Sequence, residues 1–142
     1  AEISDDYDYI FIDCPPSLGI LSINALAASS GVIIPMQCEF YSLEGLSQLM
    51  LSIRNVKRLY NPGLEITGIL ITMYNGRLNL SAQVLEEIKK YYADKLFATG
   101  IVRNVKLSEA PSYGEPIIYY DKYSKGARAY NDVAKEILER TL

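Results

Sequence analysis

Three short runs of apolar residues stand out along the chain, at residues 9–13, 32–36 and 66–73. They are rich in β-branched side chains and nearly continuous, instead of alternating between apolar and polar positions. This pattern is typical of strands that are buried on both faces, and such strands are usually parallel. The chain is therefore predicted to contain a parallel sheet that other elements cover on both sides.

Apolar residues with helical spacing separate and follow these runs. They extend over residues 43–56, 84–92 and about 124–142, and Ser42 and Ser81 are plausible N-caps of the first two helices. Strands that alternate with helices predict right-handed βαβ crossovers. We expect an α/β fold with an open, mainly parallel sheet and flanking helices.

The composition favours a single α/β domain over residues 1–142. With 49% hydrophobic and 22% charged residues the chain can bury a core, and it contains no linker or internal repeat. No apolar run approaches the roughly 18 to 20 residues that cross a bilayer. The C-terminal helix mixes charges of both signs and lacks the polybasic face of a membrane anchor. We expect a cytoplasmic protein that does not bind membranes.

The numbers of histidines and cysteines and the net charge limit which catalytic groups, metal ligands and nucleic-acid contacts the chain can offer. Because the chain has no histidine, Ser-His-Asp and Cys-His catalysis are excluded. Cys14 and Cys38 are far apart and form no CxxC pair, so we interpret them as free thiols and not as metal ligands. The net charge is only −3, so nucleic-acid binding would require a local basic patch.

A polar segment, Asp13-Cys-Pro-Pro-Ser-Leu-Gly19, directly follows the first apolar run. Its prolines and glycine predict a turn before the next helix. In open α/β sheets, ligands bind at the carboxyl ends of the strands, which is where Asp13 falls. Such an aspartate either holds Mg²⁺ against nucleotide phosphates, as the Walker B aspartate does, or serves only as a turn or cap residue. Spacing alone leaves both interpretations open.

Further segments occur in the order and spacing of one protein family. They are Ile34-Pro35 with Gln37–Leu46, Gly68–Met73, Asn104–Ser112, and Tyr120-Asp121 with Gly126-Ala127. Together with the segment that starts at Asp13, they resemble the ParA/Soj ATPases over essentially the whole chain. The resemblance implies a partial P-loop NTPase fold of the deviant Walker A, ParA/MinD-like kind, with ATP and Mg²⁺ as cofactors.

The resemblance assigns roles to residues in two regions. Asp13 would be the catalytic residue that orients Mg²⁺ through water, and a switch that senses the γ-phosphate would comprise Pro15, Pro16, Ser17 and Gly19. The residues flanking adenine would be Met73, Val102, Arg103 and Asn104. Relatives commonly have proline at the position of Val102. Without the resemblance, the loop Val102–Asn104 would be interpreted as an ordinary strand-to-helix connection.

Basic residues fall into two groups. Arg54, Lys57 and Arg58 lie on one amphipathic helix and are interpreted as a solvated face. Arg77 and Lys106 are expected in loops after two successive strands, and by resemblance they correspond to positions that hold the DNA backbone in ATP-bound homodimers. Relatives commonly have arginine at the position of Lys106. The implied DNA binding does not depend on sequence.

The chain contains no Gly-rich loop of the GKGGVGKT type, which cradles phosphates in this family. The resemblance therefore implies the C-terminal part of a nucleoid-associated ATPase for chromosome or plasmid partitioning, which works with a ParB-type partner. The chain alone is predicted to be inactive. Two alternatives remain, namely a non-catalytic interaction module derived from this fold and a MinD-like positioning ATPase.

Overall fold

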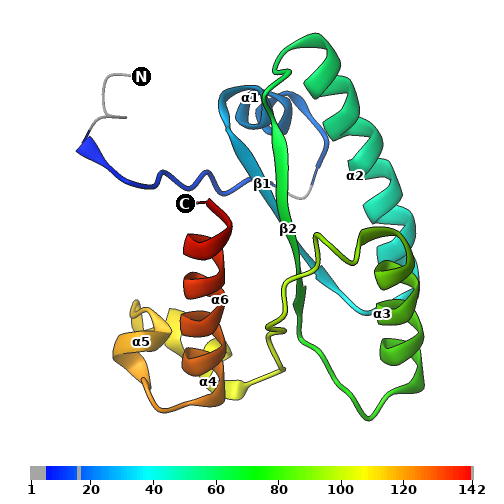
Figure 1. The fold of residues 1–142 in the computed structure, drawn as a ribbon. Helices are drawn as coiled ribbons and strands as arrows, with labels where there is room; N and C mark the ends of the chain where they lie inside the picture. Colours follow the sequence, from blue (N-terminus) through cyan, green and yellow to red (C-terminus); the bar gives the residue numbers. More distant parts are fainter. Residues whose placement is uncertain (1–5, 16, 142) are drawn as a thin grey trace.

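The computed structural model describes residues 6–15 and 17–141, and its elements are drawn in Figure 1. In chain order they are α1 (Ile20–Ala28), β1 (Gly31–Gln37), α2 (Phe40–Leu59), β2 (Glu65–Thr72), α3 (Asn79–Tyr92), α4 (Val105–Glu109), the 3-10 turn η2 (Ala110–Tyr113), α5 (Ile117–Tyr120) and α6 (Lys125–Thr141). Within the part of the chain that is described, no helix combines the length and the apolar character needed to span a bilayer.

β1 and β2 pair in parallel, with Ile34 opposite Ile69 and Gln37 opposite Thr72. α2 connects the two strands, so this part of the chain is a βαβ unit. The prediction of two parallel strands near residues 32–36 and 66–73 is confirmed. The α/β class, with a parallel sheet and flanking helices, is confirmed with it.

A further extended segment, residues 95–102, lies along the edge of β2 that faces away from β1. Ile69 donates its amide to the Lys95 carbonyl over 2.7 Å, and the Ile101 amide donates to the Ile71 carbonyl over 2.8 Å. Two isolated parallel bridges, Ile69 to Leu96 and Tyr74 to Val102, mark the ends of this pairing. The sheet thus extends beyond β2, although the ladder is interrupted in the middle of the segment.

Side chains cover both faces of β2. Ile69 and Ile71 belong to a core cluster with residues of α2 and α3, whereas Leu70 belongs to a second cluster with Phe97, Ile101 and Val133 of α6. In Figure 1, α2 and α3 accordingly lie on one side of the strands and α6 on the other. Burial on both faces explains why this strand is apolar at nearly every position.

The predicted strand at residues 9–13 is wrong. The described residues of this segment have no helical or strand structure, and Ile10, Phe11 and Ile12 are 53%, 71% and 50% exposed. A strand requires a partner for its backbone groups and cover for its faces. None of the described residues pairs with this segment in a ladder, so its apolar sequence alone does not make it a strand.

The predicted N-caps are also wrong. α2 begins at Phe40 after Glu39, and α3 begins at Asn79 after Leu78. Ser42 and Ser81 therefore lie inside the first turn of their helices. The apolar stripe starts later than the helical backbone, because the first residues of both helices are exposed and contribute nothing to the stripe.

Candidate functional site at the carboxyl edge of the sheet

The carboxyl end of β2 brings together the two parts of the region expected to flank adenine. Immediately after Thr72, the chain bends at Met73, and Tyr74 then forms a bridge to Val102 at the end of the neighbouring segment. The Tyr74 amide donates to the Ile101 carbonyl over 3.0 Å. Met73 and the loop that starts at Val102 therefore lie at the same edge, where open α/β sheets bind ligands.

Met73 has an unusual backbone conformation for its residue type. Its φ angle is 51°, and no other non-glycine residue among those described has a positive φ. A side chain with a Cβ pays about 1–2 kcal/mol to adopt this left-handed region. Such strain persists where surrounding structure imposes it, and it is common at ligand sites. The Met73 side chain is 56% exposed and is thus available for contact at this edge.

Asn104 has a clear local role at the end of the loop. It is the N-cap of α4, and its Oδ1 atom accepts a hydrogen bond from the Lys106 amide over 2.9 Å. An asparagine at this position satisfies a backbone donor that the first helical turn leaves free. The side chains of Val102 and Arg103 remain exposed at the same edge. The loop is thus anchored at its end and open to solvent before it.

The two basic residues expected to bind DNA have different surroundings. Arg77 is exposed in the loop between β2 and α3, where its backbone amide donates to Asn75 Oδ1 over 3.1 Å. Lys106 lies in the first turn of α4, so its expected loop position is wrong. The N-cap Asn104 starts the helix at Val105, before Lys106 is reached. Lys106 also forms an ion pair with Glu109, with 2.8 Å between Nζ and Oε2.

The segment expected to bind Mg²⁺ and sense phosphate is exposed. Asp13, Pro15, Ser17 and Gly19 are all accessible, and Pro16 lies outside the described residues. Gly19 is the N-cap of α1, and the buried Ser22 hydroxyl donates to the Ser17 carbonyl. Asp13 forms no hydrogen bond or ion pair with another described residue. The described contacts do not bring Asp13 to Met73 or to the loop at Val102.

A shallow hollow of about 480 Å³ lies next to the carboxyl end of β1. Among the residues that line it are Gln37 and Glu39, which follow the strand, and Ser42, Gly45 and Thr72. The sequence pattern had marked this stretch only as part of the resemblance and had assigned no role to its residues. A signal was present, because polar side chains directly after a buried parallel strand fall at the ligand-binding edge.

The fit of the site to ATP and Mg²⁺ is partial. Within residues 6–15 and 17–141, no three His, Cys, Asp or Glu side chains gather in a way that could hold a metal ion. Mg²⁺ bound next to nucleotide phosphates takes only one or two carboxylates and completes its shell with water and phosphate oxygens. Asp13 fits such a role as a single carboxylate, and Met73 with the loop at Val102 fits the role of an apolar edge for a base.

The fold belongs to a known class of nucleotide-binding proteins. A solved cobyrinic acid a,c-diamide synthase from Mycobacterium smegmatis, with bound ATP analog and magnesium, superposes with a TM-score of 0.80 at 34% identity. The match covers 97% of this chain and 50% of that one. The chain thus has the α/β architecture of the P-loop ATPases.

Sequence similarity narrows this class to one family. Residues 1–66 match the family model described as an AAA domain. The chain is 58% identical over 135 residues to the sporulation initiation inhibitor protein Soj of Bacillus subtilis, which covers 95% of this chain and 53% of Soj. It is 51% identical over 138 residues to the chromosome partitioning protein ParA of Myxococcus xanthus, and this match covers 97% of this chain and 49% of that protein. The chain belongs to the ParA/Soj family of partitioning ATPases, and it spans about half the length of these relatives.

Proposed function

We propose that this chain supplies the base-binding edge and the metal-orienting carboxylate of a ParA/Soj-type ATPase that partitions a chromosome or plasmid. The observation that carries the proposal is the meeting of Met73 with the loop at Val102, across the Tyr74 bridge, at the carboxyl edge of parallel strands. The level of identity with Soj and ParA supports the biological role.

The chemistry of this edge suits a flat, largely apolar ring. Met73 and Val102 are 56% and 37% exposed, and both present apolar atoms at this edge. Ligand pockets typically combine apolar lining with a few polar groups that fix orientation. Adenine requires both, because its faces are apolar and its edge carries hydrogen-bonding nitrogens. Arg103 and Asn104 complete the proposed binding loop.

Asp13 is the proposed residue for metal orientation, and Pro15, Pro16, Ser17 and Gly19 form the proposed switch. When bound, Mg²⁺ neutralises charge on the phosphates during hydrolysis. The carboxylate of Asp13 would help to hold the metal by accepting hydrogen bonds from water bound to it. The chain has no loop of the GKGGVGKT type, and most nucleotide affinity in such sites comes from phosphate contacts. We therefore expect the 142-residue chain alone to be inactive.

The wider function involves a homodimer, DNA and a ParB-type partner. ATP-dependent dimerisation would place two copies of Arg77 and Lys106 on one duplex, where they bind the backbone without sequence preference. Partition then depends on nucleotide-driven binding and release at the nucleoid, in the cytoplasm. The ParB-type partner would trigger hydrolysis. The match to proteins named for chromosome partitioning supports this assignment.

Two measurements test the proposal. In the intact protein, Asp13→Ala should reduce Mg²⁺-dependent ATP hydrolysis by orders of magnitude, with Asp8→Ala, an exposed aspartate of the same segment, as the matched control. Both variants should leave the thermal stability nearly unchanged, because surface substitutions usually change it by less than about 0.5 kcal/mol.

The second measurement is a calorimetric titration of the 142-residue chain with ATP and Mg²⁺. We expect only weak binding and no turnover. Low-micromolar binding, or turnover that survives Asp13→Ala, would contradict the expectation that the 142-residue chain alone binds ATP weakly and is inactive. Near-normal hydrolysis by the intact Asp13→Ala variant would favour a turn or cap role for Asp13.

A further inference from the structure

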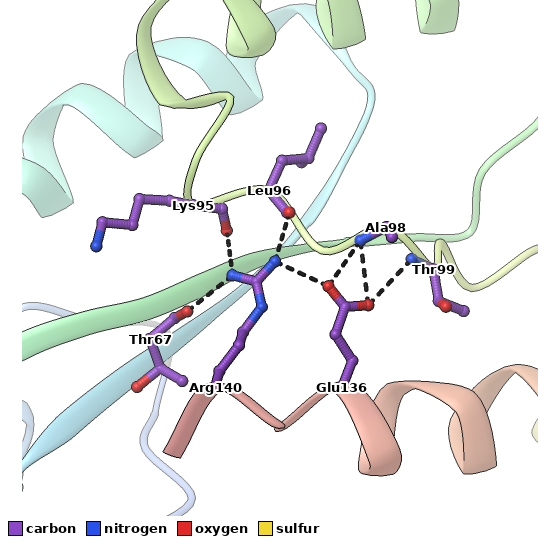
Figure 2. Close-up of polar contacts among 7 residues, drawn as sticks. All are labelled: Thr67, Lys95, Leu96, Ala98, Thr99, Glu136 and Arg140. Atoms are coloured by element: carbon purple, nitrogen blue, oxygen red, sulfur yellow. Dashed lines mark hydrogen bonds and ion pairs between the residues drawn. The ribbon is translucent and has the colours of Figure 1, made fainter. Parts of the chain in front are cut away.

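Helix α6 is attached to the sheet by two charged side chains, which Figure 2 shows in detail. Nη1 of Arg140 donates to the carbonyl oxygens of Thr67, at 3.0 Å, and Lys95, at 3.2 Å. Nη2 of Arg140 donates to the Leu96 carbonyl at 2.6 Å and to Oε1 of Glu136 at 2.8 Å. One guanidinium group therefore joins α6, β2 and the extended segment that follows α3.

Glu136 binds the same segment slightly further along. Its carboxylate accepts the Ala98 amide at 2.9 and 3.1 Å and the Thr99 amide at 3.3 Å. These are the residues at which the ladder between β2 and the segment is interrupted, so the carboxylate replaces the missing strand partner. Burial acts to raise the pKa of Glu136, but hydrogen bonds from Ala98, Arg140 and Thr99 lower it overall. The group is thus ionised at neutral pH.

The packing around this pair leaves it little freedom. The side chains of Arg140 and Glu136 are only 22% and 16% exposed, and the guanidinium carbon lies 4.3 Å from the centre of the Phe97 ring. A Cβ atom at Gly68 would lie 2.4 Å from Phe97 and 2.9 Å from Arg140 Nη1, so only glycine fits there. A partly buried ion pair that makes several further hydrogen bonds fixes geometry more than it adds stability.

The same helix also holds the chain beyond the loop. Gly126 near the start of α6 is buried, and a Cβ atom there would lie 2.6 Å from Cγ of Leu107 in α4. α4 begins directly after Asn104. α6 therefore holds the polypeptide before the loop, through Glu136 and Arg140, and after it, through the close contact with Leu107.

We propose that Glu136 and Arg140 are positioning residues that set the distance between Met73 and the loop Val102–Asn104. Thr99 is three residues before Val102, about 10 Å of extended chain, so a shift of the clamped segment is passed directly to the loop. The inference rests on the proposed function in one respect, namely that the loop contacts a nucleotide base. It adds that α6 determines how well the base fits, although α6 does not touch the ligand.

The first test uses the 142-residue chain and needs no nucleotide. Amide hydrogen exchange is compared between the parent chain, Glu136→Gln and two controls. Lys135→Gln changes the neighbouring charge on α6, which pairs with Asp132 and not with the sheet. Ile53→Val removes a methyl group from the other core cluster and reports what a general loss of stability does.

Glu136→Gln should expose the Ala98 and Thr99 amides and also lower the protection of the Tyr74 amide, whose bond to Ile101 closes the loop, by about tenfold relative to Ile53→Val. Unchanged protection of Tyr74, with loss confined to Ala98 and Thr99, would overturn the proposal. The hydrogen bonds of Glu136 would then be a local contact that has no effect on the loop. Lys135→Gln should match the parent throughout.

The second test uses the intact protein with ATP and GTP. Glu136→Gln should raise the KM for ATP by about tenfold and bring it closer to that for GTP, with kcat little changed, because base contacts are lost and phosphate contacts are kept. If the ratio of the KM for GTP to the KM for ATP is the same in the parent and the variant, the inference is overturned. If the intact parent binds no nucleotide, the proposed function fails, and the amide exchange of the isolated chain still decides whether the clamp positions the loop.

Discussion

Lys106 and Glu109 face each other across one turn of α4, with 2.8 Å between Nζ and Oε2. Tyr120 donates its hydroxyl to the same carboxylate oxygen over 3.0 Å, and its ring centre lies 5.7 Å from the lysine nitrogen. The hydrogen bond and charge of Glu109 raise the pKa of Lys106, while Lys106 and Tyr120 lower the pKa of Glu109. The lysine proposed to bind DNA is thus already paired with an anion of its own helix.

This pairing leads to a prediction about Glu109. In the intact ATP-bound protein, Glu109→Gln should tighten non-specific DNA binding by about two- to tenfold at low salt, because it removes a carboxylate that competes with phosphate for Lys106 and repels the duplex. Loss of the pair itself costs little, since exposed ion pairs contribute little to stability. DNA affinity is measured by fluorescence anisotropy with duplexes of unrelated sequence.

The matched control is Glu86→Gln. Glu86 forms the same kind of ion pair with Lys89, three residues further along α3, at 2.9 Å. Glu86→Gln changes the net charge by the same amount as Glu109→Gln, but Glu86 lies on another helix. The DNA affinity of this variant should therefore stay closer to that of the parent. Equal tightening by both variants would show a general charge effect, and weaker binding by Glu109→Gln would mean that Glu109 orients Lys106 for DNA.

A second prediction concerns the number of phosphate contacts. Arg77 and Lys106 would give two contacts per subunit and roughly four per dimer, so they would contribute about −3 to −4 to the slope of log K against log salt. Replacing both residues with alanine in the intact protein should flatten the slope by a similar amount. The measurement is a salt titration of DNA binding with ATP and Mg²⁺ present.

The control for this slope is the double substitution Arg54→Ala with Arg58→Ala. Both arginines are exposed on α2, and among the described residues the Arg58 side chain bonds only to Asn55 of the same helix, at 3.3 Å. We expect this variant to keep the parent slope. The assignment of Arg77 and Lys106 fails if the α2 variant flattens the slope and the Arg77 and Lys106 variant does not.

The local sequence pattern was sufficient to predict the elements whose packing partners lie among the described residues. The run at residues 66–73 is apolar at nearly every position because α2 and α3 cover one face and α6 the other, and that composition is visible without the fold. The long helices were equally visible from their apolar stripes. The run at residues 9–13 has the same composition but no ladder partner among the described residues. Hydrophobicity encodes a tendency to be buried, and it does not encode whether a partner is present.

The candidate site was only partly accessible from the sequence. Met73 and Val102 were selected by resemblance, and no local rule predicts that a methionine adopts a left-handed conformation or that Tyr74 bridges to Val102. The ion pair of Lys106 with Glu109 had a signal, the spacing of opposite charges by three residues on a helix. Glu136 and Arg140 had the same kind of signal at spacing four. Their contacts with the sheet depend on tertiary packing, which spacing does not reveal.

The last prediction follows from the lowered pKa of Glu136. Burial opposes this direction, but the hydrogen bonds from Ala98, Arg140 and Thr99 outweigh it, so the folded state favours the ionised carboxylate more than the unfolded state does. A group with a depressed folded pKa contributes stability that is present above its unfolded pKa and is lost as the pH falls through its folded pKa. The 142-residue chain should therefore lose part of its stability as the pH falls below the ordinary range of a glutamate.

The measurement is the free energy of unfolding of the parent chain and of Glu136→Gln, by urea denaturation at several pH values from neutral to acidic. The variant should be less stable at neutral pH, by about 1–3 kcal/mol, because Arg140 and two backbone amides lose their anionic partner. The difference between the two chains should shrink on acidification, with a slope that one titrating group limits to about 1.4 kcal/mol per pH unit. Lys135→Gln serves as the control and should follow the parent. A difference that stays constant from neutral to acidic pH would mean that the charge of Glu136 is not what holds α6 to the sheet.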